Sequence, residues 1–126
     1  MAALNGIVAQ RLVRLTCTAC GVPFEPDALL LKRSGIDPAR RAVAAFRRGQ
    51  GCASCRGSGY RGRRAISETL RISDALREQM VQRASLSAVR QTARAEGFRS
   101  LRDAAIDLAC SGVTTLEEIN RVTPVE

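Results

Sequence analysis

The chain has 126 residues, of which 45% are hydrophobic and 25% are charged, and its formal net charge is +8 at pH 7. This balance is typical of one globular domain and excludes a disordered chain, and no apolar window approaches the roughly 20 residues that span a bilayer. Because aromatic residues make up only 3%, we expect a core of Leu, Val, Ile and Ala. The excess of arginine favours an anionic or acidic partner, or a larger protein whose other parts balance the charge.

The first 16 residues carry two overlapping patterns. Apolar side chains in residues 4–15 recur at a helical spacing, whereas residues 12–16 alternate like a strand. We therefore predict a helix to about Gln10, followed by a strand that leads into the first cysteine pair. Arg11 and Arg14, with no acid before Glu25, faintly resemble a transit peptide, but the adjacent cysteines favour a structural segment.

Two Cys-x-x-Cys pairs, Cys17 with Cys20 and Cys52 with Cys55, are the strongest signal in the chain. At this spacing a tight turn directs two thiolates to one ion, and two pairs supply the four ligands of a structural zinc. Four thiolates leave no open position for a catalytic water. Two matched pairs also favour metal over a redox motif and over disulfides. Cys110 stands apart, and we expect it to be an ordinary small buried residue.

The residues between the two pairs predict a helical hairpin tied at its base by the metal. Asp27 is expected to cap a short leucine-rich helix that ends at Gly35. Asp37 is expected to cap a second helix, over residues 39–48, with a proline at its favoured first position. The buried face of that second helix is predicted to consist of Val43 and Phe46.

Glycines and arginines follow the second cysteine pair, in residues 56–63, and indicate turns in the backbone. Residues 65–70 then read as a short strand, which we expect to pair antiparallel with residues 12–16. If these two strands pair, the cysteine-containing loop is an insertion between them. The predicted fold class is therefore α+β and mostly helical.

The rest of the chain is predicted to be a bundle of short helices. Their starts are marked by capping residues, of which Ser100 and Asp103 resemble a capping box: Ser73 or Asp74, Ser85, Ser100, and Thr114 or Thr115. Gly97, Gly112 and Pro124 are expected to end helices. The side chains expected to face inward are Leu76, Met80, Val81, Leu86, Val89, Ala93, Leu101, Ala104, Ala105 and Leu108.

Several features expected of an enzyme are missing from the sequence. The chain has no histidine, which removes the usual general base and the Cys-His nucleophile pair. It has no Gly-x-x-x-x-Gly-Lys-Ser/Thr phosphate loop, and its acids are spread without an evident catalytic pair. We therefore expect no catalytic residues and no cofactor-binding residues other than the metal ligands. A free-standing zinc-ribbon-like nucleic-acid binder is the alternative, with arginines to hold phosphates but no interleaved aromatics for base stacking.

Five segments, in order along nearly the whole chain, resemble one family. They are residues 4–14 closed by the first cysteine pair, residues 51–63 around the second pair, residues 66–70, residues 97–103 and residues 112–123. They are similar to segments of the type II secretion ATPase, the general secretion pathway E protein, which is related to the type IV pilus assembly ATPases. The chain departs from the family at Ala65, where the family usually has Gly, and at Cys110.

This resemblance implies a C-terminal fragment of a hexameric ATPase that powers pseudopilus assembly and type II protein secretion. Zinc on the four paired cysteines would be structural, while ATP and Mg²⁺ would bind only in the parent protein, which is an enzyme although the fragment is not. Residues 1–16 would end the ATPase core, residues 17–62 would form the metal-binding subdomain, and residues 63–126 would form a strand and the helical subdomain.

The resemblance also implies a place and partners for the parent protein. It would lie in the cytoplasm, peripheral on the bacterial inner membrane. We expect its partners to be neighbouring subunits of the hexamer, inner-membrane platform proteins or anionic lipid, and we do not expect nucleic acid to be a partner. The basic surface expected to face such a partner consists of Arg33, Arg40, Arg41, Arg47 and Arg48.

Overall fold

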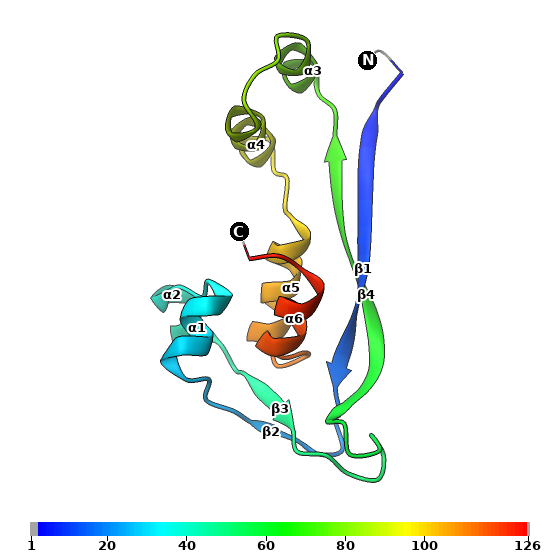
Figure 1. Ribbon diagram of the computed structural model, residues 1–126, viewed down its shortest axis with the longest axis vertical. Helices are drawn as coiled ribbons and strands as arrows, with labels where there is room; N and C mark the ends of the chain where they lie inside the picture. The colour runs from blue at the N-terminus through cyan, green and yellow to red at the C-terminus, as the bar shows by residue number, and fades with distance from the viewer. Residues whose placement is uncertain (1–2, 126) are drawn as a thin grey trace.

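The computed structural model describes residues 3–125 and has the predicted α+β architecture (Figure 1). Within that range the elements, in chain order, are β1 (Gly6–Thr16), β2 (Gly21–Pro23), α1 (Ala28–Ser34), α2 (Pro38–Val43), β3 (Arg47–Gly49), β4 (Tyr60–Arg71), α3 (Asp74–Val81), α4 (Leu86–Ala95), α5 (Leu101–Cys110) and α6 (Leu116–Val122). None of the helices in the described range combines the length and apolar character that crossing a membrane requires.

The long antiparallel ribbon of β1 and β4 is the backbone of the molecule. Its register pairs Ile7 with Leu70 and Arg14 with Arg63, and it shifts at a bulge between Arg14 and Thr16. The predicted antiparallel pairing is confirmed, but β4 is longer than expected. As a result, residues 65–70 pair with residues 7–12 and not with residues 12–16.

The helix predicted to reach Gln10 is wrong, because β1 is a strand from Gly6 onward. The apolar residues of this segment satisfy a helical spacing, and they also place side chains on both faces of a strand. The choice between the two depends on β4, which pairs with β1 along almost its whole length. That partner lies more than fifty residues away in the sequence, so local spacing gave the wrong element.

The second predicted helix is shorter than expected, because α2 ends at Val43 and the chain becomes extended at Ala44. Residues 47–49 instead form β3, which pairs antiparallel with β2 in a short ribbon that no sequence pattern indicated. Val43, predicted to be buried, is 85% exposed. Phe46, the other residue predicted to be buried, is partly buried and packs against the main core.

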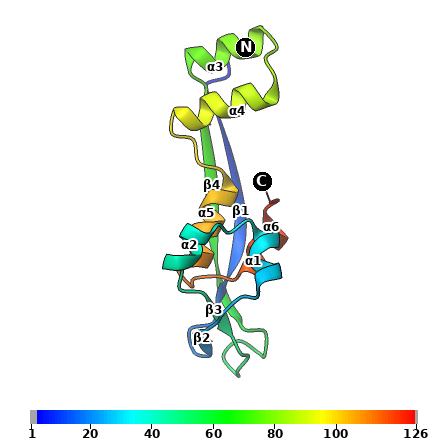
Figure 2. The same cartoon turned by 90° about the vertical axis from the view of Figure 1, so that its left-hand side faces the viewer.

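The hairpin of α1 and α2 lies beside α5 and α6, and the turns from β1 to β2 and from β3 to β4 lie at one end of the molecule (Figures 1 and 2). Leu31 of α1 belongs to the main hydrophobic core, and the backbone N–H of Ala45 donates to the carbonyl of Cys110 at 2.7 Å. The hairpin is therefore held by the C-terminal helices as well as by the cysteine turns at its base.

The C-terminal helices form two separate clusters, which corrects the prediction of one bundle. The main core contains Val13, Leu31, Ile66, Ala105, Ile106, Ala109, Leu116 and Ile119. A smaller core of Ile72, Leu76 and Ala93 joins α3 and α4 at the opposite end of the ribbon from the cysteines (Figure 1). Val81 and Leu86, predicted to face inward, are 72% and 64% exposed.

The predicted helix starts are confirmed. The capping side chains each accept a hydrogen bond from the backbone N–H three residues later, and they are Asp27, Asp37, Ser73, Ser85, Ser100 and Thr115. Ser100 and Asp103 form the full reciprocal capping box. Of the two threonines proposed for the last helix, Thr115 is the cap. Short polar side chains thus specify the helix starts locally, whereas no comparable local signal specifies the strands.

Candidate metal centre

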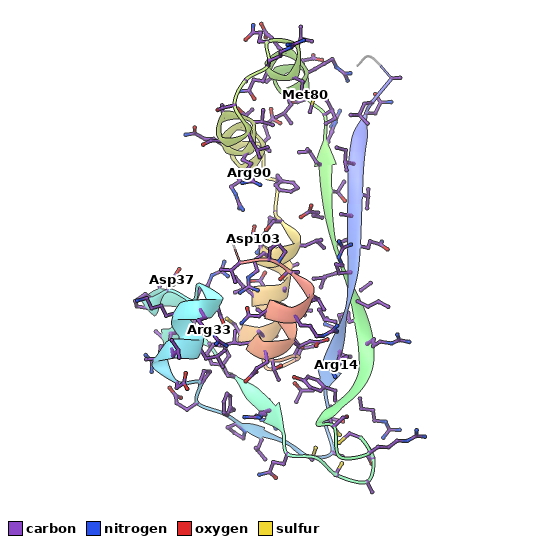
Figure 3. All side chains as sticks on the ribbon, in the orientation of Figure 1. Arg14, Arg33, Asp37, Met80, Arg90 and Asp103 are labelled. Carbon is purple, nitrogen blue, oxygen red and sulfur yellow. The ribbon has the colours of Figure 1, made fainter. Side chains whose placement is uncertain are left out.

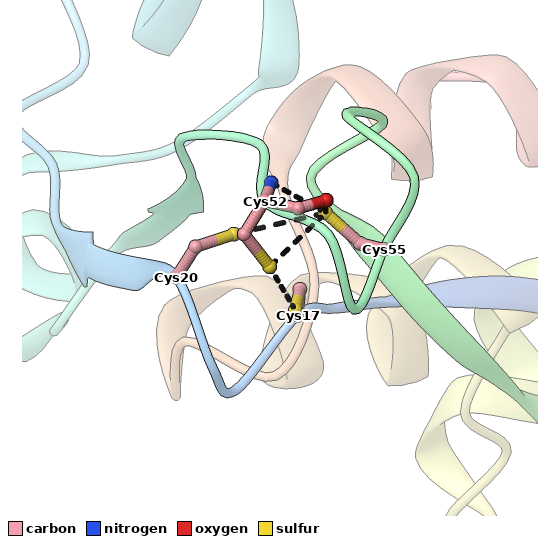
Figure 4. Close-up of side chains that lie close together, drawn as sticks. All are labelled: Cys17, Cys20, Cys52 and Cys55. Carbon is pink, nitrogen blue, oxygen red and sulfur yellow. Dashed lines mark hydrogen bonds between the residues drawn. The ribbon is translucent and has the colours of Figure 1, made fainter.

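The four paired cysteines come together at one point, although 31 residues separate the two pairs in the sequence (Figure 4). Their Sγ atoms all lie within 4.8 Å of one another. The Sγ atoms of Cys17 and Cys52 are 3.8 Å apart, as are those of Cys20 and Cys55, and the Cys52 and Cys55 atoms are 3.7 Å apart. A disulfide would bring two sulfur atoms to about 2.05 Å, so these cysteines are free thiols.

These distances fit the ligand set of a tetrahedral metal ion. With Zn–S bonds of about 2.3 Å, the sulfur atoms of a regular tetrahedron are about 3.8 Å apart. The three separations between Sγ atoms given above are 3.7–3.8 Å. Four soft sulfur ligands in this arrangement favour zinc over hard cations such as Mg²⁺ or Ca²⁺, which prefer oxygen.

Each pair occupies a turn between two strands. Cys17 and Cys20 lie in the turn that connects β1 to β2, and the second pair lies between β3 and β4. At the second turn, the backbones of Gly49 and Gly59 approach so closely that a Cβ on Gly59 would lie 2.6 Å from the carbonyl oxygen of Gly49. Gly59 also has φ +81°, which disfavours any other residue. The two glycines therefore let β3 and the start of β4 converge at the cysteines.

Backbone N–H groups point at the sulfur atoms. The N–H of Gly51 donates to Sγ of Cys20 at 3.3 Å, and the N–H groups of Cys52 and Gly59 both donate to Sγ of Cys55 at 3.2 Å. Such donors stabilise negative charge on sulfur. The turns are thus arranged to hold thiolates, which are the form that binds metal.

The surroundings shift the thiol pKa values in different directions. Burial opposes ionisation of Cys55, but the N–H donors of Cys52 and Gly59 lower its pKa to about 6. The backbone N–H of Cys20 lowers the pKa of Cys17. Burial raises the pKa of Cys20 to about 11. Because four neighbouring thiolates repel one another, a cation at their centre is needed to hold all four ionised.

Cys110 does not belong to this group. It lies at the end of α5, is partly buried, and packs against the main core. Burial raises the pKa of its thiol, which makes it less reactive. This placement agrees with the expectation that Cys110 is an ordinary packing residue.

The arginines predicted to form a partner surface lie on α1, α2 and β3. Three of them make contacts within the chain. Arg41 pairs with Glu25 at 3.4 Å, Arg47 donates to the carbonyl of Gly21 at 2.6 Å, and the Arg48 guanidinium lies 5.3 Å from the centre of the Phe24 ring. The remaining two, Arg33 (Figure 3) and Arg40, make no ion pair within residues 3–125.

Two charged residues that organise the structure were not recognised in the sequence. Glu118, in the first turn of α6, is 1% exposed and pairs with Arg14 and Arg121. Arg102 is 3% exposed and donates to the carbonyl of Ser34 at 2.6 Å. The Glu118 carboxylate bonds to Arg14 and Arg121, and no local signal in the sequence pairs it with a residue 104 positions away.

Comparison with known proteins relates this arrangement to one family. Residues 1–121 match the family described as type II/IV secretion system protein. The chain is 41% identical over 118 residues to a type IV pilus assembly ATPase, PilB, of Thermus thermophilus, covering 94% of this chain and 13% of the relative.

Two further relatives carry a different description. The chain is 39% identical over 120 residues to the type II secretion system ATPase E of Vibrio cholerae, covering 95% of this chain and 23% of the relative. It is also 39% identical over 121 residues to the type II secretion system protein E of Pseudomonas aeruginosa, covering 96% of this chain and 24% of the relative. The chain thus spans less than a quarter of the length of these three relatives.

Proposed function

Because this chain belongs to the family of type II/IV secretion system proteins, we propose that it forms the zinc-binding and C-terminal helical portion of a hexameric ATPase that powers pseudopilus assembly and type II protein secretion. The chain itself has a structural or partner-binding role and is not catalytic. ATP hydrolysis with Mg²⁺ takes place in other parts of the protein, since this sequence contains no phosphate loop and no histidine.

The observation that carries the proposal is the four-sulfur cluster. Cys17, Cys20, Cys52 and Cys55 would hold one Zn²⁺, which supplies cross-linking and positive charge where the two turns meet. The part of the chain from residue 17 to residue 62 has little core of its own, because its β2–β3 ribbon has only three residue pairs. Metal binding would therefore contribute directly to its folding.

The rest of the proposal concerns place and partners. The protein acts in the cytoplasm, peripheral on the inner membrane, and contacts neighbouring subunits and the inner-membrane platform of the secretion system. Arg33 and Arg40 are the residues of the basic surface best placed for such a contact, since Arg41, Arg47 and Arg48 already make contacts within the chain. Anionic lipid is a further candidate for the same arginines.

The metal is tested in the full-length protein by elemental analysis and limited proteolysis. We expect one zinc per chain, and a Cys52→Ser variant should lose the zinc and the protease resistance of residues 17–55. Cys110→Ser is the matched control, because Cys110 lies outside the cluster, and it should keep both. A protein that is folded and fully active without metal would overturn the structural role.

The secretion role is tested by deletion and complementation in the source bacterium. Loss of exoproteins from the culture medium, restored by the wild-type protein and not by the Cys52→Ser variant, is the expected result. Loss of surface pili with normal secretion would instead assign the protein to pilus assembly. Salt-sensitive binding of the purified protein to DNA at physiological ionic strength, without ATP hydrolysis, would favour the nucleic-acid-binding alternative.

A further inference from the structure

The turn between α5 and α6, residues 111–115, lies against the strand that leads into the first cysteine turn. We call it the α5–α6 turn. The backbone N–H of Thr16 donates to the carbonyl of Val113 at 2.9 Å. The hydroxyl of Thr114 donates to the carbonyl of Arg14 at 2.7 Å. Thr16 directly precedes Cys17, a proposed metal ligand. The α5–α6 turn is therefore hydrogen-bonded to the residue next to the cysteine cluster.

The same turn also lies against the second half of the cysteine-containing loop. The carbonyl of Cys110, the last residue of α5 before the turn, accepts the N–H of Ala45 at 2.7 Å. Gly112 is packed so closely that a Cβ on it would lie 2.8 Å from the carbonyl oxygen of Ala45 and 2.8 Å from the Arg47 side chain. Beyond the second cysteine turn, the hydroxyls of Tyr60 and Thr115 lie 2.6 Å apart.

These two sides meet at the cysteines. The N–H of Cys17 donates to the carbonyl of Gly59 at 2.9 Å, and the N–H of Gly59 donates to Sγ of Cys55 at 3.2 Å. Tyr60, which contacts the α5–α6 turn, is the next residue. The ends of β1 and β4 are also joined by the long ribbon, in which Thr16 pairs with Tyr60. The Ala45–Arg47 segment, against which Gly112 packs, is linked to these strand ends through the cysteine cluster and the short β2–β3 ribbon, and isolated two-stranded ribbons are only marginally stable.

We propose that metal bound at the four-cysteine site fixes the surface on which the α5–α6 turn packs. Metal binding and the docking of α5 and α6 are then thermodynamically coupled. This inference rests on the metal site proposed above. A metal ion fixes the position of the Ala45–Arg47 segment relative to the ends of β1 and β4, and the α5–α6 turn packs against both. Coupling of this kind is reciprocal, so a change in the turn must alter metal affinity by the same factor by which metal alters docking.

Two glycine substitutions test the reciprocal effect. Gly112 and Gly97 both follow helices, and both have positive φ, +79° and +96°, so alanine causes similar backbone strain at each. Only the added Cβ at position 112 meets the metal-binding part of the chain, whereas nothing lies within 4 Å of a Cβ at position 97. In the full-length protein, Gly112→Ala should weaken zinc affinity, measured by competition with a chromogenic chelator, by roughly 5- to 150-fold. Gly97→Ala should leave it unchanged.

A milder variant covers the case in which Gly112→Ala does not fold. Tyr60→Phe removes the hydroxyl that contacts Thr115 and keeps the aromatic ring, while Thr115 still caps α6. It should also weaken zinc affinity, by a smaller factor. Equal zinc affinity in the wild type, Tyr60→Phe and Gly112→Ala proteins would overturn the coupling while leaving the metal site intact.

Hydrogen–deuterium exchange tests the forward effect. Removal of zinc by a chelator should increase exchange in residues 110–122 and leave α3 and α4 unchanged, because those helices pack in the separate smaller core. Unchanged exchange in residues 110–122, with zinc demonstrably bound and then removed, would overturn the coupling alone. A protein that binds no zinc would overturn the proposed function as well, so the two failures are distinguishable.

Discussion

At the scale of single residues, Glu118 is the group on which the joint between β1 and α6 depends. Its carboxylate accepts hydrogen bonds from the guanidinium groups of Arg14 and Arg121 and from the backbone N–H of Arg14 at 2.8 Å. The Arg14 guanidinium also lies 4.2 Å from the centre of the Tyr60 ring. This one buried carboxylate therefore joins β1 to the last helix, and Arg14 in turn contacts Tyr60 of β4.

Replacing Glu118 with glutamine should destabilise the protein. The variant keeps the shape of the side chain but removes the charge that two arginines share, and it leaves a buried amide with poorer partners. Hydrogen bonds to charged groups are each worth about 1.5–3 kcal/mol. Because both arginines are partly exposed, we expect a net loss of about 2 kcal/mol in the free energy of unfolding, measured by urea denaturation. Glu117→Gln, at an exposed neighbouring position, should change it by less than about 0.5 kcal/mol.

The contribution of Glu118 should also depend on pH. Burial opposes its ionisation, but hydrogen bonds from Arg121 and Arg14 lower its pKa from 4.5 to about 2. The folded protein thus binds fewer protons at this group than the unfolded chain between these two values, so its stabilising effect is complete above about pH 5 and is lost as the pH falls toward 2. The stability difference between wild type and Glu118→Gln should be constant from pH 7 to 5 and should shrink below pH 4.5. A constant difference down to pH 3, measured by thermal unfolding, would contradict this assignment.

At the scale of elements, the helices and strands of this chain were specified by different means. The helix starts carry their own signals, since a capping side chain bonds to a backbone N–H three residues away. The strands lack such local information. β1 satisfies a helical spacing yet pairs with β4, and β3 lies where an uninterrupted helix was predicted. Partners distant in the sequence decide such segments, because an isolated strand cannot satisfy its own backbone hydrogen bonds.

The capping box of α5 gives an element-scale prediction. The hydroxyl of Ser100 accepts from the N–H of Asp103 at 3.1 Å, and the carboxylate of Asp103 accepts from the N–H of Ser100 at 3.0 Å. Ser100→Ala removes one of these bonds and should cost about 1 kcal/mol of unfolding free energy, measured by chemical denaturation. Ser87→Ala, at an exposed site inside α4, is the control and should be neutral or slightly stabilising, since alanine favours helix.

At the scale of the whole molecule, two cores of different size share one long ribbon. The main core holds β1, β4, α1, α5 and α6 together, and the smaller core of Ile72, Leu76 and Ala93 holds α3 and α4. The segment between α4 and α5 joins the two parts of the helical region (Figure 1). With so few buried residues of its own, the α3–α4 part should open more readily than the rest.

Leu76→Ala tests this division. Leu76 is fully buried, and removing such a side chain costs about 2–5 kcal/mol. We expect faster hydrogen–deuterium exchange throughout α3 and α4, with exchange in α5 and α6 and zinc content unchanged. Val81→Ala, at a residue that is 72% exposed, should have little effect. Faster exchange in α5 and α6 as well would indicate one cooperative unit.

The sequence by itself determined the features that depend on residues close together in the chain. These are the two Cys-x-x-Cys turns, the helix caps and the glycines that end helices, all of which depend on short spacings. The family was also recognised from short segments, each of which is local in the sequence. A turn of four residues positions two sulfur atoms without help from distant parts of the fold. For that reason the candidate ligands Cys17, Cys20, Cys52 and Cys55 were identified together before the structure placed them within 4.8 Å of one another.

Only the tertiary structure decided which long-range partners those local pieces meet. Pairing with β4 made β1 a strand, and the pairing of β3 with β2 ended α2 early. Packing against Arg14 buried the carboxylate of Glu118 in an ion pair. Long-range contacts also divided the helices between two cores and placed the α5–α6 turn against the ends of β1 and β4. All of these features depend on contacts between residues far apart in the sequence. Such residues become buried only when the whole chain folds.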